Sequence, residues 1–319
     1  MHREIGGYLE LERFTGPLQH EGALALSGGR ACLSYLIEQR EIRKLALPDY
    51  ICDVVEAVCR AHGVAVRRYR VGTDLRPEPL RAEDDEWVYL VNYYGQLAEG
   101  ELREYAGRFP KLIVDNAQAY YAPPLPSVDT LYTCRKFIGV ADGGFLYTDA
   151  PARELPRDES LERMDFVLGR FERDAGTFFA SAARNNDELP GESRRMSRLT
   201  ENLLRAVDDA QIRDARTRNF RLLHEALREH NRQDVRETEG PYAYPLRLPN
   251  GPAVRRKLIE KKIFVPMLWP NVPEEQPADA AACRLAKEIL PLPCDQRYGA
   301  EEMRFIIDTV LQNLAETEE

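Results

Sequence analysis

Residues 111–147 read KLIVDNAQAYYAPPLPSVDTLYTCRKFIGVADGGFLY, and this stretch decides the fold. A short apolar run, 112–114, stops at Asp115, and a second short run, 131–133, leads to Lys136. A carboxylate at the carboxyl end of a buried strand is a common ligand contact in an open α/β sheet. The chain between the two runs is long enough to bring both side chains into neighbouring positions of one pocket.

Aspartate and lysine together point to one kind of chemistry. A lysine amine can form a Schiff base with the aldehyde of pyridoxal phosphate. A carboxylate can keep the pyridine nitrogen of that cofactor protonated, so that the ring accepts electrons from a substrate carbanion. On these two residues alone, two other interpretations stay open: a buried salt bridge between Asp115 and Lys136, or side chains that never meet.

The same stretch resembles the active-site region of the DegT/DnrJ/EryC1/StrS aminotransferases. These are pyridoxal-phosphate enzymes of fold type I that act mainly on nucleotide-linked keto sugars. The resemblance rests on Asp115, on Ala-Gln at 117–118, on Lys136 and on Gly-Gly at 143–144. It implies a fold-type-I α/β architecture: a large domain with a mainly parallel seven-stranded sheet flanked by helices, and a smaller C-terminal α+β domain.

The rest of the chain alternates short apolar segments with amphipathic ones, which is typical of a mainly parallel sheet covered by helices. We expect a lead-in segment (1–20), a large cofactor-binding domain (21–200), a connecting helix (201–231) and a small C-terminal domain (232–319). The patterning also predicts one helix over 160–183 and a short strand over 263–265.

By resemblance, Lys136 is the catalytic residue that forms the aldimine and then moves a proton between the substrate and cofactor carbons. Asp115 is the second catalytic residue and pairs with the ring nitrogen. Gln118 is expected near the ring or its phenolic oxygen. Tyr50 is expected to position the ring by stacking on it, and the alternative for Tyr50 is packing on the core at a helix start.

A short strand, a glycine turn and a helix follow one another over 23–40, and a helix N-terminus reached in this way is a ready anion site. Ser27 is expected to cap the helix. The resemblance implies that the cofactor phosphate lies at Gly29 and Arg30. Thr133 is expected as a further phosphate contact.

Two positions depart from the family pattern. Leu131 stands where the sugar aminotransferases more often carry a serine that contacts the phosphate. Ser193 stands where many members carry an asparagine that reaches the phosphate of the partner subunit's cofactor. Ser193 keeps a hydroxyl, and we expect it to take that role.

The resemblance implies a reaction that moves an amino group from an amino acid, with glutamate as the expected donor, to a keto group of a nucleotide-linked sugar. Such reactions serve polysaccharide and antibiotic-sugar biosynthesis. Tyr94 and Trp269 are expected to line the substrate pocket, and a turn or packing role is the alternative for each. The resemblance also implies a homodimer with its active sites at the interface.

Two other functions remain open. One is different pyridoxal-phosphate chemistry on a substrate that is not a sugar. The other is a binding or regulatory protein that has kept the fold without turnover, which the departures at Leu131 and Ser193 leave possible.

The composition limits the range of partners. The 319 residues carry a net charge of −9 and are 30% charged, with arginines interleaved among acidic residues, so a one-sign basic surface for nucleic acid is not expected. No apolar run approaches a membrane span and no signal sequence opens the chain, which predicts a cytoplasmic protein without membrane contact. The six cysteines lack metal-ligand spacing and are expected to be reduced core thiols, with no metal site.

Overall fold

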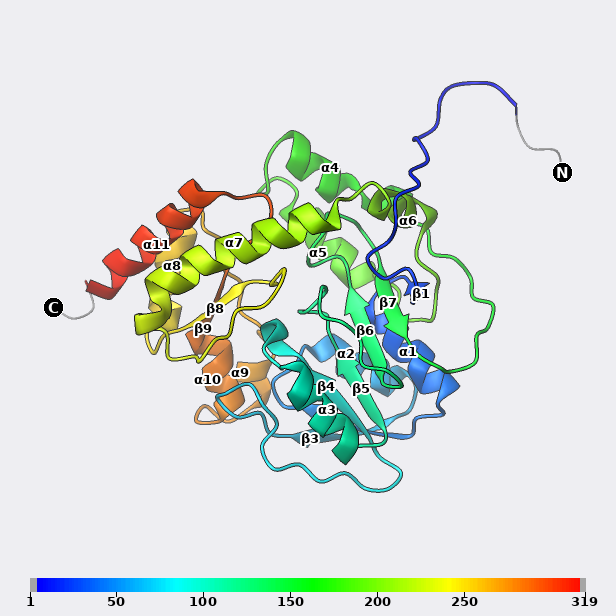
Figure 1. The fold of residues 1–319 in the computed structure, drawn as a ribbon, viewed down its shortest axis with the longest axis horizontal. Helices are drawn as coiled ribbons and strands as arrows, with labels where there is room; N and C mark the ends of the chain where they lie inside the picture. The colour runs from blue at the N-terminus through cyan, green and yellow to red at the C-terminus, as the bar shows by residue number, and fades with distance from the viewer. Residues whose placement is uncertain (1–4, 316–319) are drawn as a thin grey trace.

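Seven strands form the central sheet of the computed structural model, which describes residues 5–315 (Figure 1). The strands are β1 (Leu24–Leu26), β2 (Lys44–Pro48), β3 (Ala65–Tyr69), β4 (Trp87–Val91), β5 (Leu112–Asp115), β6 (Asp129–Thr133) and β7 (Gly144–Tyr147). Their order across the sheet is β1-β7-β6-β5-β4-β2-β3. β7 runs antiparallel to β1 and β6, and the other neighbouring strands are parallel. The mainly parallel seven-stranded sheet is therefore confirmed.

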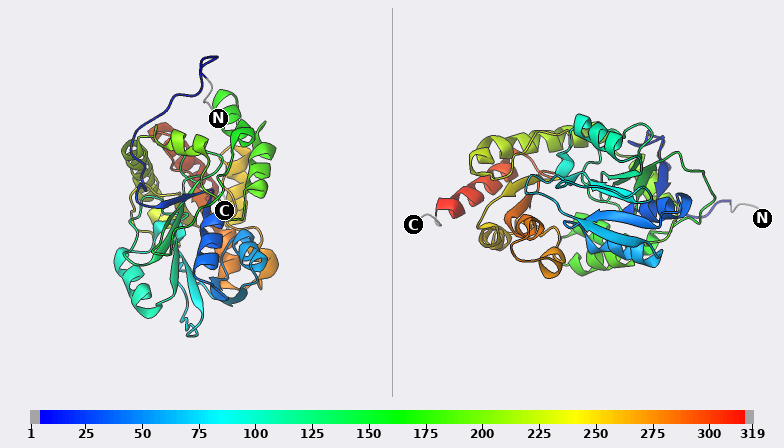
Figure 2. Two further views of the ribbon diagram at one scale, coloured as in Figure 1. Left: turned by 90° about the vertical axis from the view of Figure 1, so that its right-hand side faces the viewer. Right: turned by 90° about the horizontal axis from the view of Figure 1, so that it is seen from below.

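Helices cover both faces of this sheet (Figure 2). The helices α1 (Gly29–Gln39) and α2 (Asp53–Ala61) lie on one face, and α3 (Glu99–Arg108) lies on the other. Every residue of β5 and β6 is buried. A strand that is covered on both sides needs a continuous apolar run rather than alternation. This is why the short run 112–114 already predicted a strand.

The segment 160–188 contacts the loop after β6 and differs from the sequence prediction. One helix was expected over 160–183, and this prediction is wrong. A 3-10 turn (Leu161–Arg163) comes first, followed by two helices, α4 (Asp165–Glu172) and α5 (Phe179–Glu188). Between them Asp174 accepts hydrogen bonds from the backbone N–H and the hydroxyl of Thr177, both at 2.9 Å. Such local side-chain bonds compete with helix continuation.

The connection to the C-terminal part also differs. Instead of one helix over 201–231, the chain forms α6 (Arg198–Leu204) and α7 (Asp209–Leu227), and α7 runs past the sheet toward the C-terminal part (Figure 1). The break lies at Asp208, whose side chain accepts a hydrogen bond from Gln211 N at 3.0 Å. An aspartate in this position satisfies a free N–H at a helix start and so begins a new helix.

The C-terminal part is a smaller α+β unit, as the resemblance implied. Its sheet pairs β8 antiparallel to β9, and its other elements are helices. The elements are β8 (Tyr244–Arg247), α8 (Gly251–Glu260), α9 (Val272–Glu275), α10 (Ala281–Glu288), β9 (Ile289–Leu292) and α11 (Ala300–Ala315). Leu223, Leu246, Leu258 and Met303 belong to its own hydrophobic cluster, separate from the clusters around the large sheet. The strand expected over 263–265 does not form.

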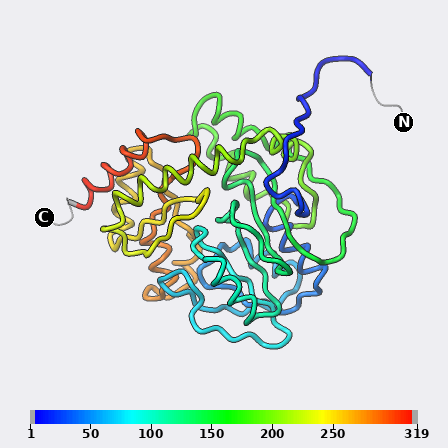
Figure 3. The backbone as a smooth tube through the Cα atoms, viewed as in Figure 1, coloured from blue at the N-terminus to red at the C-terminus, as the bar shows by residue number. Residues whose placement is uncertain are grey.

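The first described residues extend away from the body of the molecule (Figure 3). Ile5, Tyr8 and Leu9 are more than 90% exposed. Of the helices that the structure describes, none is both long and apolar enough to pass through a membrane. All six cysteines are free thiols, and five of them are buried.

Candidate active site

The carboxyl ends of β4, β5 and β6 lie side by side and carry the predicted catalytic pair. Val91, at the end of β4, pairs with Asp115, and Asp115 pairs with Leu131 of β6. Lys136 follows three residues after β6 ends at Thr133. Ligands of open α/β sheets bind outside the carboxyl ends of the strands. The structure therefore places Asp115 and Lys136 at the edge of the sheet where a ligand is expected.

Asp115 is buried and held in one orientation. One oxygen, Oδ2, accepts a hydrogen bond from the Tyr89 hydroxyl at 2.9 Å, and Oδ1 accepts one from Ala117 N at 2.7 Å. Burial raises the pKa of Asp115, and the charge of Lys136 opposes this effect. The carboxylate is thus fixed by two donors and lies within the electrostatic reach of the lysine.

Lys136 is partly buried, and its amine has no ion-pair or hydrogen-bond partner among residues 5–315. Its Nζ lies 5.4 Å from the centre of the Tyr242 ring. Burial lowers the pKa of Lys136, and the nearby Asp115 charge only partly offsets that shift. A lowered pKa increases the uncharged, nucleophilic fraction of an amine at neutral pH. The two side chains therefore meet electrostatically without forming a closed salt bridge.

The N-terminus of α1 offers free backbone donors near this pair. The first intrahelical bond joins Cys32 N to Gly28 O at 3.0 Å, so the N–H groups of Gly29 and Arg30 come before it. The prediction that Ser27 caps this helix is wrong. Gly28 takes the N-cap position, and the Ser27 hydroxyl is buried with no partner in the described part of the chain.

Arg135 is a site residue that the sequence reasoning missed. Its Nε is buried and finds no hydrogen-bond partner within residues 5–315. Burial lowers the pKa of Arg135, and the charge of Arg30 lowers it further. Within residues 5–315, Arg30 donates to the Leu189 carbonyl at 3.2 Å and forms no ion pair. Two neighbouring guanidinium groups with no carboxylate bound to either one favour an anion between them. The only sequence signal was an arginine next to Lys136 in a buried segment.

The other predicted phosphate contacts are engaged elsewhere within the chain. Thr133 donates its hydroxyl to Gly143 O at 3.1 Å. Ser193 donates to Glu38 Oε2 at 2.8 Å, and Glu38 lies near the C-terminal end of α1. At 1.5 Å per residue that end is roughly 13 Å from Gly29. Within one chain, Ser193 is therefore not part of the α1 N-terminal site, and its role toward a partner subunit stays a prediction.

Four predicted residues form two contacting pairs. Gln118 accepts a hydrogen bond from Tyr94 N at 2.8 Å. Tyr50 packs edge-on against Trp269, with ring centres 5.0 Å apart. Stacking of Tyr50 on a cofactor ring thus stays a prediction.

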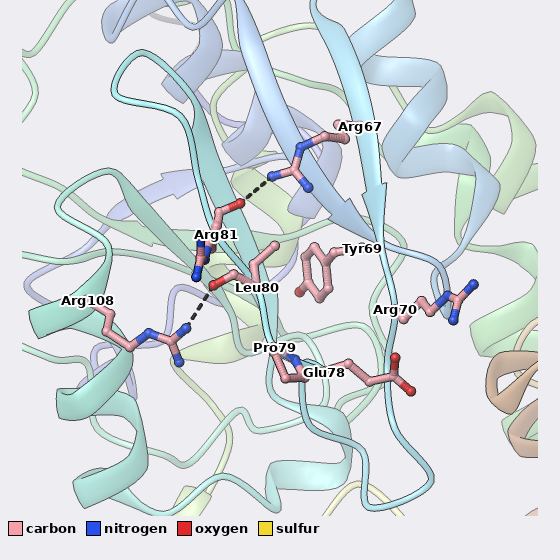
Figure 4. Close-up of a pocket in the computed structure, with 8 residues that line it drawn as sticks. All are labelled: Arg67, Tyr69, Arg70, Glu78, Pro79, Leu80, Arg81 and Arg108. Carbon is pink, nitrogen blue, oxygen red and sulfur yellow. Dashed lines mark hydrogen bonds between the residues drawn. The ribbon is translucent and has the colours of Figure 1, made fainter.

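A separate groove of about 430 Å³ lies at the far edge of the sheet (Figure 4). Its lining includes Tyr69 of β3 and four arginines, among them Arg67 and Arg108. Arg67 is already paired with Glu86. The strand β3 is an edge strand, separated from β5 by β2 and β4. This groove is therefore not part of the site around Asp115 and Lys136.

Solved structures share this fold along most of the chain. DesV of S. venezuelae, in complex with a ketimine intermediate, is 16% identical with a TM-score of 0.66, covering 94% of this chain and 90% of that one. A DegT DnrJ EryC1 StrS aminotransferase from Brucella abortus is 15% identical with a TM-score of 0.63, covering 91% and 85%.

A third match is Spr1654 from Streptococcus pneumoniae, a sugar aminotransferase by its description, in its PLP form. It is 13% identical with a TM-score of 0.61, covering 93% of this chain and 91% of that one. The chain matches no protein-family model and no curated protein. From β1 to α11 the chain therefore has the fold of the DegT/DnrJ/EryC1/StrS sugar aminotransferases.

Proposed function

We propose that this protein is a pyridoxal-phosphate-dependent aminotransferase that moves an amino group from glutamate to a keto group of a nucleotide-linked sugar. One observation carries the proposal: Asp115 and Lys136 converge at neighbouring strand ends without closing into a salt bridge. Two arginines without ion-pair partners in the described chain, Arg30 and Arg135, lie nearby. The fold shared with sugar aminotransferases supports the choice of substrate class.

The residues of this site fit the cofactor. The α1 N-terminus with Arg30 and Arg135 offers donors for a phosphate dianion. Asp115 offers a carboxylate for the protonated ring nitrogen, and Lys136 offers an amine for the aldehyde. Gln118 Nε2 is buried and has no partner within residues 5–315, so it is free to donate to a ring oxygen. When bound, pyridoxal phosphate supplies an electron-accepting ring.

The protein's own groups would then orient the cofactor and move protons. Asp115, held by Tyr89 and the backbone, fixes where a positive ring nitrogen is favoured. Lys136 Nζ, with its pKa lowered by burial, can take up a proton and return it. Trp269 and Tyr50 pack together over the ends of β2 and β4 and help to exclude water.

The direct test is a visible absorbance spectrum of the protein with pyridoxal phosphate, before and after glutamate is added. We expect a yellow band that is lost with glutamate as the cofactor passes to its amine form. A band that persists with every amino acid tried would support a binding protein without turnover. Conversion by another amino donor but not by glutamate would keep the aminotransferase and change its amino donor. A protein that stays colourless with added cofactor would contradict the proposal.

A prediction about Arg135 concerns the binding of cofactor and phosphate and does not depend on turnover. Replacing it (Arg135→Gln) is expected to weaken cofactor binding about 10- to 100-fold, because a hydrogen bond to a charged group contributes about 1.5–3 kcal/mol. The affinity of the cofactor-free protein for inorganic phosphate should fall in parallel, as measured by calorimetry. The matched control is Arg218→Gln, an exposed arginine on α7. Unchanged affinities in the Arg135 variant would remove Arg135 from the phosphate site.

The assembly and location belong to the same proposal. We propose a homodimer, because Ile5, Tyr8 and Leu9 are nearly fully exposed apolar residues, and the N-terminal segment that carries them extends from the body and is suited to cover a second copy (Figure 3). Light scattering would show a mass of twice the chain, and a mass of one chain would contradict the dimer. The six free cysteines fit a reducing compartment such as the cytoplasm.

A further inference from the structure

The turn that carries Lys136 is held by hydrogen bonds to the backbone of the next residue, Phe137. Within the turn, Phe137 N donates to the Cys134 carbonyl at 2.8 Å. From outside the turn, the Phe137 carbonyl accepts two hydrogen bonds, one from Arg216 Nη2 at 3.1 Å and one from Gln296 Nε2 at 2.8 Å. Arg216 belongs to α7 and Gln296 follows β9, so two side chains from distant parts of the chain fix the position of this turn.

Arg216 also holds the residue whose ring faces the Lys136 amine. Its Nη1 donates to the Pro241 carbonyl at 3.0 Å and to the Tyr242 carbonyl at 3.4 Å. The centre of the Tyr242 ring lies 5.4 Å from Lys136 Nζ. One guanidinium group therefore ties together the backbone that carries the lysine and the backbone that carries its aromatic neighbour.

Packing alone does not explain an arginine at this place. Arg216 is 2% exposed and forms no ion pair among residues 5–315, since Asp295, whose charge reaches it, is paired with Arg297. A buried charge of this kind is costly, and an apolar residue of similar volume is often as stabilising or more so. The guanidinium provides what an apolar residue cannot, a planar set of donors that reaches several acceptors at once. Its Nε uses one of them to donate to Gln296 Oε1 at 2.9 Å.

We propose that Arg216 and Gln296, which together we call the clamp, are positioning residues that hold the Lys136 amine in its buried place at the site. The inference rests on the proposed aminotransferase function, in which Lys136 is the reacting amine. The clamp acts through the backbone of Phe137 and Tyr242 and is not itself catalytic. A displacement of about 1 Å in a reacting group can slow a reaction about 100-fold, so a rigid turn matters at this position.

Competitive acetylation of the full chain, freed of cofactor, tests the clamp without any turnover. The protein is treated with a trace of acetic anhydride at a series of pH values, and mass spectrometry compares Lys136 with exposed lysines such as Lys257. The midpoint of the Lys136 profile reports the pKa of its amine. Burial and the charge of Arg135 lower that pKa, and the charges of Asp115 and Cys52 raise it. The clamp variants leave all of these charged groups in the chain.

Arg216→Met removes the donors of the clamp and keeps a long apolar side chain. We expect the midpoint of Lys136 to rise by about one pH unit, because a released turn lets water reach the amine, and full burial can lower the pKa of a lysine by several units. Gln296→Leu removes one of the two outside donors to Phe137 and should give a smaller rise. Arg216→Lys keeps the charge but loses the planar fork, so the midpoint should stay raised.

The matched control is Arg255→Met. Arg255 is also buried, and it donates to two backbone carbonyls, those of Lys287 at 3.3 Å and Ile289 at 2.7 Å. Neither carbonyl belongs to the turn that carries Lys136. The midpoint of Lys136 should therefore be the same in this variant as in the wild-type protein, although a buried arginine has again been lost.

An unchanged midpoint in folded Arg216→Met would overturn the clamp, and so would an equal shift in Arg255→Met. A wild-type midpoint in Arg216→Lys would assign the effect to charge and would also overturn it. Should Arg216→Met not fold, Gln296→Leu decides, because an unchanged midpoint there would mean that the bond to the Phe137 carbonyl does not hold the amine.

These outcomes are independent of the proposed reaction. A yellow protein that responds to glutamate, but whose Lys136 midpoint does not depend on Arg216, would keep the aminotransferase and remove the clamp. A protein without a cofactor band whose Lys136 midpoint moves in Arg216→Met would contradict the aminotransferase and keep the clamp.

Discussion

Lys136→Ala is expected to abolish the yellow band of the cofactor-loaded protein and to slow conversion by glutamate by about 10⁴-fold. The substitution removes both the amine that binds the aldehyde and the group that moves the proton. Acid–base catalysis by one positioned side chain contributes about 10²–10⁴-fold. Lys136 has no ion-pair partner within residues 5–315, and burial lowers its pKa. The stability of the folded protein should therefore not depend on the charge of Lys136, and the Tm of the variant should stay level or rise.

Absorbance, single-turnover kinetics and thermal melting together check this prediction. The control is Lys257→Ala, an exposed lysine on α8, which should keep the band and the rate. An unchanged spectrum in the Lys136 variant would show that this lysine does not hold the cofactor. A lost band with a much lower Tm would instead point to a structural role for the side chain.

Asp115→Asn is expected to keep the band while slowing conversion about 10²- to 10³-fold, the usual cost of removing one preorganised electrostatic group. Asparagine has nearly the same shape and still offers an oxygen to Ala117 N, but it cannot stabilise a positive ring nitrogen. The loss should therefore appear in the rate of conversion rather than in the binding of glutamate.

The same variant carries a pH prediction whose sign follows from the site. Burial lowers the pKa of Lys136, and the negative charge of Asp115 offsets part of this lowering. Without that charge the pKa of Lys136 falls further, so the free amine persists to lower pH. The pH dependence of cofactor incorporation should shift to lower pH in Asp115→Asn. It should not shift in the control Asp308→Asn, on an exposed position of α11. A shift to higher pH, or a wild-type rate of conversion, would contradict the proposed role.

The hydrophobic and charge pattern of a segment was enough to predict its structure where the residues of that segment alone decide it. The run 112–114 is apolar on both faces and ends in a carboxylate, and it forms β5 with Asp115 as its last residue. The helix α3 has acidic residues in its first turn and Arg108 in its last, a charge pattern that favours a helix over its own residues. These features need no knowledge of the rest of the chain.

Local pattern failed where a single side chain interrupts a longer periodic segment. The helices expected over 160–183 and 201–231 are broken, because Asp174 bonds to Thr177 and Asp208 caps α7. The hydrophobic spacing continues through both breaks and hides them. Whether an aspartate caps a helix or lies inside one depends on where its own hydrogen bond forms.

The sequence by itself determined the mainly parallel sheet and the positions of Asp115 and Lys136 at or just after the ends of neighbouring strands. This was possible because apolar runs and their polar ends are local signals. Only the tertiary structure decided that the charge of Arg30 reaches the buried Arg135, and that Ser193 bonds to Glu38. The reason is physical. Whether a polar group is buried and left without a partner depends on segments far apart in the chain, and no pattern in one segment records it.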